Sequence, residues 1–414
     1  MFGSVPDGAI EEPSPRRVAM SNEMMVGVNA NLADSFSAAR GPADDKDLRM
    51  WLPRFALEDW FARYKPECDV NIGSSDVEPV TVADLLEPDT RVGDVSLEYG
   101  GASGSLALRE QVSELHPGTG ASDVQCTTGA TEAVLALYSA ILRPGDHVVV
   151  VTPVYQLLVD LPTALGATVT EVPLVRDGER WVLPAIAVAN AVRNTTRAIV
   201  VNSPNNPTGW TATDTQLAEL AVLAHDIGAV LVSDEVYRGI GPVTSTAVQL
   251  HASAVVVGSV SKTYGTAGLR VGWVVTRDAE LRDSLRTVRY WTTLSSSPLT
   301  DSMAVHTLRA ASRLLDRANR IVDVNADLVR DFVAARDDVD HVAPQGGTTA
   351  WVELLAHDAE DVARRLAVEH RVFTVPSKAL CTPGHHLRIG LGRVDLERGL
   401  SALTRILEDP RSRR

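Results

Sequence analysis

The chain has 414 residues, a formal net charge of −14 and 45% hydrophobic residues. This length allows a large core and favours two domains of unequal size. The negative charge argues against nucleic acid or an anionic membrane as the main partner, and apolar runs such as residues 148–151 are too short to span a bilayer. Three widely spaced cysteines suit a reducing cytosol and match no zinc-ligand spacing. We therefore expect a cytoplasmic protein with no membrane or nucleic-acid partner and no metal site.

The first fifty residues are rich in Ser, Pro, Ala, Asp and Arg, which is typical of a flexible extension. Apolar residues recur at helical spacing over residues 51–60, and residues 69–79 predict a short strand that ends in a Gly/Ser/Pro loop. Three further elements are expected before residue 115: a short helix at 83–87, a flexible turn at 99–104 and a helix at 105–114.

Strands and helices alternate from residue 123, in the pattern of an α/β fold. Strands are predicted at residues 123–127, 147–151, 168–172, 198–202, 230–233, 254–258 and 271–275. Helices are predicted at residues 131–142, 155–165, 183–192, 214–226 and 278–290. The apolar, β-branched strands indicate a largely parallel sheet between helices. Because no helix separates the last two strands, one of them should be antiparallel.

The C-terminal region is predicted to begin with a long amphipathic helix over residues 301–336 and to end in a small α+β unit. The elements of that unit are expected at residues 348–354, 358–369, 372–376, 387–391 and 395–407. The predicted domains are a flexible extension (1–50), the N-terminal part of a small domain (51–90), a large domain (91–297), and a linking helix with the C-terminal small domain (298–414).

Lys262 lies among small residues in a segment, residues 258–273, that follows an apolar strand. Only four of the 39 basic residues are lysines. A lysine can lose its proton and attack a carbonyl as a Schiff-base nucleophile, whereas an arginine cannot. Ser259 and Arg270 are suited to contacts with a phosphate. An ordinary loop lysine is the alternative interpretation.

The string at residues 128–132, Thr-Gly-Ala-Thr-Glu, lies between a strand and a helix. In an open α/β sheet the amide groups at such a junction bind phosphate. The string also suits a plain capped helix, and it is not a dinucleotide fingerprint because no Gly-x-Gly-x-x-Gly follows a strand.

Two further strings place polar side chains at the ends of apolar strands. Asn206, within residues 202–209, is positioned to donate its amide into a pocket. Asp234 stands where an unpaired charge is costly, so a protonated pyridine nitrogen would be a fitting partner, with Tyr237 donating to a ring oxygen. A simple turn and an Asp that caps it are the alternatives.

Tyr155 and Arg388 are the remaining candidates. Tyr155 follows a strand and is positioned to stack on a flat ring, although a solitary aromatic is also common in a core. Arg388 lies inside an apolar strand and needs an anion, which a substrate carboxylate or an internal salt bridge would supply.

Together and in this order, the strings resemble pyridoxal-phosphate enzymes of the aspartate aminotransferase fold (fold type I), class I/II. The resemblance covers roughly residues 57–407 and implies pyridoxal 5'-phosphate as cofactor. It implies that Lys262 forms the Schiff base with the cofactor and shuttles a proton, and that Arg388 binds the substrate α-carboxylate. The other implied cofactor contacts are Asp234 to the pyridine nitrogen, Tyr237 and Asn206 to the ring oxygen, Tyr155 on the ring face, Gly129, Ala130, Thr131, Ser259 and Arg270 to the phosphate, and Tyr99 from the second subunit of a homodimer.

Within that superfamily, three strings are similar to arginine-cyclising enzymes of the capreomycidine synthase type. They are residues 57–60 with the Gly73-Ser74-Ser75 loop, residues 289–298 and residues 344–351. The resemblance implies dehydration of a hydroxyarginine and ring closure by its guanidine, in antibiotic metabolism. The loop departs from the family pattern because Asp76 and Glu78 follow the serines and the family's histidine is missing; the two carboxylates are either able to bind a cationic side chain or solvated.

Three functions use these residues. The first is a cyclase acting on an arginine-derived amino acid, and the second is a conventional aminotransferase that exchanges an amino group with a 2-oxo acid. The third is a non-catalytic, cofactor-binding regulator, but the polar N-terminal extension is unsuited to supply the DNA-binding module of such proteins.

Overall fold

The computed structural model describes residues 52–86 and 90–412, so the predicted extension at residues 1–50 lies outside the described residues. A seven-stranded sheet has the strand order β2-β10-β9-β8-β7-β3-β4. Its strands are β2 (Val124–Thr127), β3 (His147–Thr152), β4 (Thr168–Pro173), β7 (Thr196–Asn202), β8 (Val230–Asp234), β9 (Val255–Ser259) and β10 (Gly272–Val275). Every neighbouring pair is parallel except the two that involve β10. The predicted α/β fold with a mainly parallel sheet and one antiparallel strand is confirmed.

Helices cover both faces of this sheet because its strands are apolar on both sides. Val149 and Val151 of β3 pack in one core cluster, and Val148 and Val150 pack in another. The first cluster includes residues of α3 (Leu106–Glu114), α6 (Ala185–Ala191), α7 (Asp214–Asp226), α8 (Ala247–Leu250) and α10 (Pro298–Arg309). The second includes residues of α4 (Gly129–Ile141), α5 (Leu157–Ala164) and α9 (Ala279–Trp291). Because alternate side chains of one strand are buried on opposite faces of the sheet, each face is covered by its own layer of helices.

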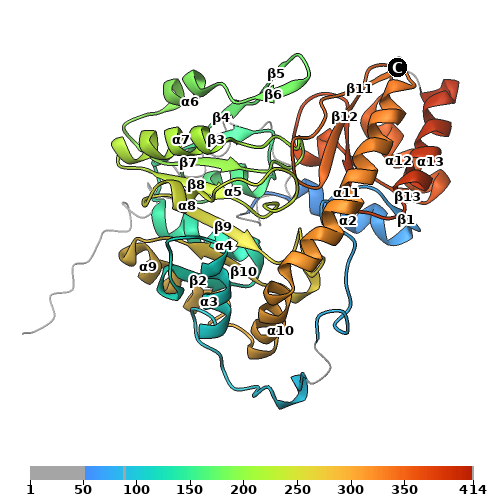
Figure 1. Cartoon of the computed structure of the whole chain (residues 1–414). Coiled ribbons are helices and arrows are strands. Elements are labelled where there is room, and N and C mark those ends of the chain that lie inside the picture. The colour runs from blue at the N-terminus through green and yellow to red at the C-terminus, as the bar shows by residue number, and fades with distance from the viewer. Residues whose placement is uncertain (1–51, 87–89, 413–414) are drawn as a thin grey trace, which may run out of the picture. The chain divides into compact units, whose positions relative to one another are not determined.

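A smaller α+β part contains elements from both the beginning and the end of the described chain. Its four-stranded antiparallel sheet has the order β11-β12-β15-β14, and β1 pairs in parallel with β13. Figure 1 shows the blue segments α2 and β1 beside the red C-terminal elements. The strands are β1 (Val70–Asn71), β11 (Val339–His341), β12 (Thr349–Leu354), β13 (Val372–Phe373), β14 (Val375–Pro376) and β15 (His386–Gly390), and the helices are α2 (Ala56–Tyr64), α11 (Ala311–Ala334), α12 (Ala359–His370) and α13 (Leu396–Glu408).

Four local predictions differ from the structure. Residues 83–85 form a turn rather than a helix, because Asp84 accepts hydrogen bonds from the backbone and hydroxyl groups of Thr81. The predicted helix at 301–336 is two helices, α10 and α11, which meet at Ala310. The first helix begins at Ala56, later than predicted.

The fourth difference is a hairpin that the sequence analysis missed. Strands β5 (Val175–Asp177) and β6 (Arg180–Val182) pair around Gly178, whose φ is 58°. The two turn residues are Gly178 and Glu179, because Asp177 pairs with Arg180. A glycine at the first central position favours such a tight turn, so the signal was present in the sequence.

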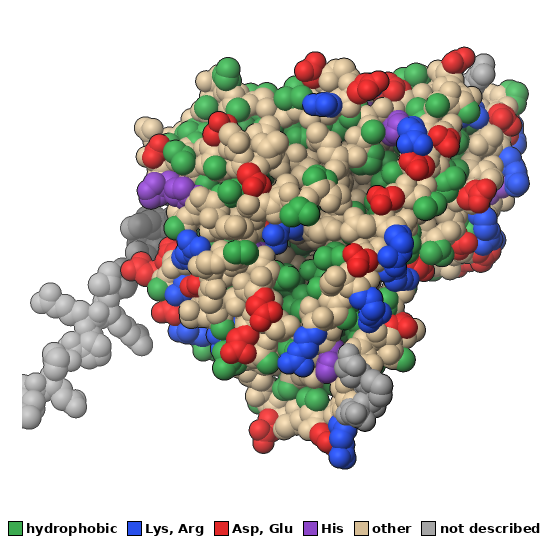
Figure 2. Space-filling model, viewed as in Figure 1, with side chains coloured by type: hydrophobic (Ala, Val, Ile, Leu, Met, Phe, Trp, Pro, Cys, Tyr) green, Lys and Arg blue, Asp and Glu red, His purple; other side chains and the backbone are tan. Residues whose placement is uncertain are grey.

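The surface carries charges of both signs. Figure 2 shows acidic and basic side chains interspersed over one face. No helix in residues 52–86 or 90–412 has the length and apolar character needed to cross a bilayer.

Candidate active site

The predicted site residues follow strands that end at the same edge of the large sheet. β7, β8 and β9 are mutually parallel, and β2 runs in their direction because β10 is antiparallel to both β2 and β9. Asp234 is the last residue of β8, and Asn206, Lys262 and the first turn of α4 lie just beyond the ends of β7, β9 and β2. This carboxyl edge is where ligands bind in open α/β sheets.

Lys262 is held against the loop formed by residues 73–79, which we call the 73–79 loop. The Lys262 amine donates to Ser75 Oγ at 3.2 Å, and the Tyr237 hydroxyl donates to the same oxygen at 3.0 Å. The Val77 amide donates to the Lys262 carbonyl at 3.0 Å. The structure thus brings a lysine, a tyrosine and a serine from three distant segments into one hydrogen-bonded group.

Asp234 ends β8 and is only 7% exposed. Burial raises the pKa of its carboxyl to about 7, although the Val236 amide and the Lys262 charge act in the opposite direction. Among the described residues no Lys, Arg or His forms an ion pair with it. A buried carboxyl of this kind fits a protonated ring nitrogen, because a positive partner would stabilise its charged form.

Gly129 and Arg270 form a concave surface at the start of α4. Gly129 has a φ of 79°, and a Cβ atom there would overlap the Arg270 guanidinium. Arg270 also donates to Ser261 Oγ at 3.4 Å, and the Ser261 amide donates to Ser259 Oγ at 3.3 Å. Amides at a helix start, two hydroxyls and a guanidinium are the donors that a phosphate accepts from.

Glu132 orders this helix start, a role that the sequence analysis did not assign. Its carboxylate accepts from the Thr128 amide and from the hydroxyls of Thr292 and Thr293, and it lies 3.7 Å from Arg289 Nε. The signal that could have found it is the acidic residue in the first turn of a helix that begins at Gly129.

Arg388 on β15 is 1% exposed. Its Nε and Nη2 groups donate to the Gly73 carbonyl at 3.1 and 2.8 Å, and Nη1 donates to Asn206 Oδ1 at 3.1 Å. Both acceptors are neutral, and burial lowers the pKa of the guanidinium. No carboxylate in residues 52–86 or 90–412 forms an ion pair with Arg388. A buried cation of this kind fits a carboxylate ligand.

The serines and acidic residues of the 73–79 loop make internal contacts. Ser74 Oγ accepts from Asn71 Nδ2 at 2.9 Å. Asp76 pairs with Arg393 at 2.7 Å, and Glu78 lies 4.0 Å from the same guanidinium. The two carboxylates are therefore engaged by one internal cation rather than only by water.

The two predicted site tyrosines differ in their surroundings. Tyr155 is half-buried after β3, and its hydroxyl donates to Glu58 Oε1 at 3.2 Å. Its ring lies 5.3 Å from the Phe55 ring between centroids. Tyr99 is 87% exposed, and no hydrogen bond joins it to the other predicted site residues in the described part of this single chain.

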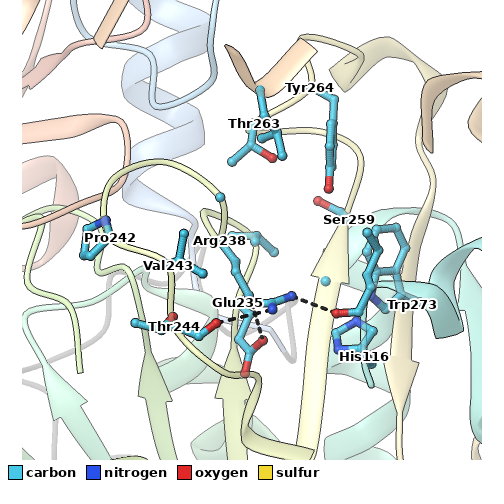
Figure 3. Close-up of a pocket in the computed structure, with 15 residues that line it drawn as sticks. His116, Glu235, Arg238, Pro242, Val243, Thr244, Ser259, Thr263, Tyr264 and Trp273 are labelled. Carbon is cyan, nitrogen blue, oxygen red and sulfur yellow. Dashed lines mark hydrogen bonds and ion pairs between the residues drawn. The ribbon is translucent and has the colours of Figure 1, made fainter. Parts of the chain in front are cut away.

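A cavity of about 180 Å³ lies next to this group of residues (Figure 3). Glu235, Arg238 and His116 contribute polar side chains to it, while neither Lys262 nor Asp234 lines it. Arg238 Nε lies 3.9 Å from Glu235 Oε2, beyond hydrogen-bond reach. Of the residues predicted to bind a cofactor, Ser259 alone lines this cavity, so the cavity adjoins the predicted cofactor site without containing it.

The comparisons with known proteins agree with this geometry. The family model for aminotransferase class I and II matches residues 68–406. The chain is 34% identical to capreomycidine synthase from Streptomyces vinaceus over 85% of this chain and 93% of that one. It is 31% identical to an arginine–pyruvate transaminase from Pseudomonas aeruginosa over 71% and 77% of the two chains. The crystal structure of the PLP-dependent cyclase OrfR is 30% identical, with a TM-score of 0.79 over 90% of this chain and 100% of that one. The chain is therefore a pyridoxal-phosphate-dependent enzyme of the class I and II aminotransferase family.

Proposed function

We propose that this enzyme removes water from a hydroxyarginine and closes a ring through the guanidine of the substrate. Two similarities support the proposal: one to capreomycidine synthase over nearly its whole length, the other to a PLP-dependent cyclase. The observation that carries it is the position of Ser75, whose hydroxyl bridges the Lys262 amine and the Tyr237 hydroxyl.

The residues at the carboxyl edge of the sheet fit the cofactor. We assign Asp234 to the ring nitrogen, Tyr237 and Asn206 to the ring oxygen, and Tyr155 to the ring face. Gly129, Ala130, Thr131, Ser259 and Arg270 are assigned to the phosphate, and Lys262 to the covalent bond. When bound, pyridoxal phosphate supplies an electron sink for the carbon that bears the substrate amino group.

Arg388 and the 73–79 loop are assigned to the substrate. A carboxylate at Arg388 would provide the anionic partner that this buried guanidinium lacks among the described residues, in a bidentate pair. Ser74 and Ser75 line the approach, and Asp76 would need to leave Arg393 to contact a substrate cation. The loop is also bound to the backbone of Lys262 and would keep water from the reacting atoms.

Elimination of water needs a second group that carries a proton, whereas simple transamination does not. Lys262 takes the proton from Cα, and the departing β-hydroxyl must gain a proton to leave as water. The Ser75 hydroxyl contacts the Lys262 amine directly, so it can pass a proton between the lysine and the leaving group. A guanidine nitrogen then forms a bond to the β-carbon and loses a proton to the same groups, and Lys262 returns a proton to Cα.

Conventional transamination is the alternative function. It is supported by the 31% identity to an arginine–pyruvate transaminase, and it needs Lys262 as the only proton carrier. Both functions bind an arginine-like amino acid, so they differ in product rather than in substrate class.

We further propose the setting in which the enzyme works. It is a cytoplasmic homodimer of specialised (antibiotic) metabolism, with Tyr99 reaching the phosphate of the second subunit. The exposure of Leu97, Tyr99 and Trp291, each above 80%, supports a covered interface. A large domain (91–297) and a small domain (51–90 with 298–414) follow residues 1–50. A measurement of the molecular mass in solution tests the dimer, and a mass of 44.4 kDa, which is that of one chain, would contradict it.

A single-turnover experiment distinguishes the two reactions. Holoenzyme is mixed with one equivalent of 3-hydroxyarginine, and separately with arginine, and the products are identified by mass spectrometry. We expect a cyclic product that is one water lighter than the hydroxyarginine substrate, with the amino group retained. Stoichiometric transfer of the amino group from either amino acid to the cofactor, without ring formation, would favour the transaminase.

Lys262→Ala should abolish the visible absorbance of the bound cofactor and its trapping by borohydride, because the variant lacks the amine that makes the covalent bond. Lys378→Ala is the control, since Lys378 pairs with Glu360 on the surface at 2.6 Å. Retention of borohydride trapping in the Lys262 variant would refute the assignment.

Asp234→Asn should have opposite effects with and without cofactor. The pKa of the Asp234 carboxyl is 3.8 in the unfolded chain and about 7 in the cofactor-free folded protein. Between these two pH values only the unfolded chain releases the carboxyl proton, so the free energy of unfolding of the wild type falls as the pH rises through this range. Cofactor-free Asp234→Asn should therefore be more stable than wild type at pH 8, by at most about 4 kcal/mol, with no advantage near pH 4. It should also bind the cofactor more weakly. Chemical denaturation at both pH values tests this, and an advantage of equal size at both would contradict it.

A further inference from the structure

Glu58, on the first turn of α2, carries a carboxylate beside the assigned substrate site. Its Oε1 accepts from the Tyr155 hydroxyl at 3.2 Å, and its negative charge acts on the buried Arg388 guanidinium. The negative charges of two carboxylates, Asp76 and Glu58, favour the charged form of Arg388. These two are therefore the candidates to contact a cation on the side chain of a substrate whose α-carboxylate is bound at Arg388.

The two carboxylates differ in whether a cation already holds them. Asp76 is paired with Arg393 at 2.7 Å, and both of these side chains are largely buried. Glu58 is exposed, and in residues 52–86 and 90–412 no Lys, Arg or His forms an ion pair with it. The neighbouring Asp59, in contrast, pairs with Arg54 at 3.3 Å. Glu58 is thus the carboxylate near Arg388 that is available to a cationic ligand.

Contacts made by the neighbouring residues of α2 fix the position of Glu58. Leu57 is 3% exposed in a core cluster, and Trp60 Nε1 donates to the Thr374 carbonyl at 2.9 Å. The Ala56 amide donates to Gln156 Oε1 at 2.9 Å, which ties the start of α2 to the segment after Tyr155. A carboxylate in the first turn of a helix is also stabilised by the helix dipole. The side chain is therefore presented as an anion by a rigid element.

We infer that Glu58 binds the guanidinium of the substrate and so selects arginine-derived amino acids. The inference rests on the proposed function, because Arg388 must hold the α-carboxylate for the side chain to extend toward α2. A carboxylate matches a guanidinium in shape and charge through two parallel N–H···O bonds. Tyr155 acts as a positioning residue, since its hydroxyl occupies one lone pair of Glu58 and orients the carboxylate. For ring closure, such a contact would also limit the conformations of the guanidine before it reaches the β-carbon.

The test is a titration of the holoenzyme with L-arginine and with L-citrulline, monitored by the absorbance of the cofactor. Citrulline has the same length as arginine but carries a neutral urea group. Glu58→Gln keeps the shape and removes the charge, so the dissociation constant for arginine should rise about tenfold while that for citrulline changes less than about twofold. Asp59→Asn, on the same helix, is the control and should change neither constant.

A second variant keeps the test decisive. Tyr155→Phe retains the ring that is assigned to the cofactor face and loses only the hydroxyl that orients Glu58. It should weaken arginine binding by a smaller factor than Glu58→Gln, and the loss of affinity should be greater for arginine than for citrulline. Equal dissociation constants for arginine in Glu58→Gln and wild type, or an equal loss for both amino acids, would overturn the inference. If the cofactor absorbance of the wild type changes with neither amino acid, the proposed substrate class is overturned as well. A transamination product would overturn only the proposed reaction, and the result for Glu58 would stand.

Discussion

Two buried charges without ion partners in the described residues organise this active site. Asp234 and Arg388 come from different sheets, and each is held by neutral hydrogen-bonding groups. Burying an unpaired charge lowers the free energy of unfolding by several kcal/mol, and the packing of the hydrophobic cores has to compensate for this loss. The cost is offset when ligands of opposite charge bind. With the ligands proposed for Asp234 and Arg388, part of the folding free energy would appear as affinity for a cationic ring and an anionic carboxylate.

The 73–79 loop connects Arg388 of the small sheet to Lys262, which follows a strand of the large sheet. Its Gly73 carbonyl accepts from Arg388, its Ser75 hydroxyl accepts from Lys262, and the Glu78 amide donates to the Gly392 carbonyl. A Cβ at Gly390 would overlap the Ser74 carbonyl, so the loop lies directly against β15. A displacement of this loop would therefore move the carboxylate-binding and proton-transfer groups together.

The sequence was most informative where function depends on the ends of strands. Asp234, Asn206 and Lys262 were predicted from apolar runs that stop at a polar residue, and parallel pairing brings such residues to one edge. The break between α10 and α11 at Ala310 was missed because no Gly or Pro marks it. Glu58 and the bridging role of Ser75 were missed for a different reason. Their partners, Tyr155, Lys262 and Tyr237, are distant in sequence, and only tertiary packing brings them together.

Cofactor chemistry and substrate choice are therefore carried by different parts of the chain. The groups proposed to hold pyridoxal phosphate lie mostly at the edge of the large sheet. The groups proposed to choose among amino acids and among reactions, Glu58 and Ser75, come instead from the short N-terminal elements α2 and the 73–79 loop. These elements contribute little to the large core, so they can change without loss of the cofactor site. If these assignments hold, one family fold supports both transamination and cyclisation, because the segments proposed to contact the substrate vary while the sheet proposed to bind the cofactor is kept.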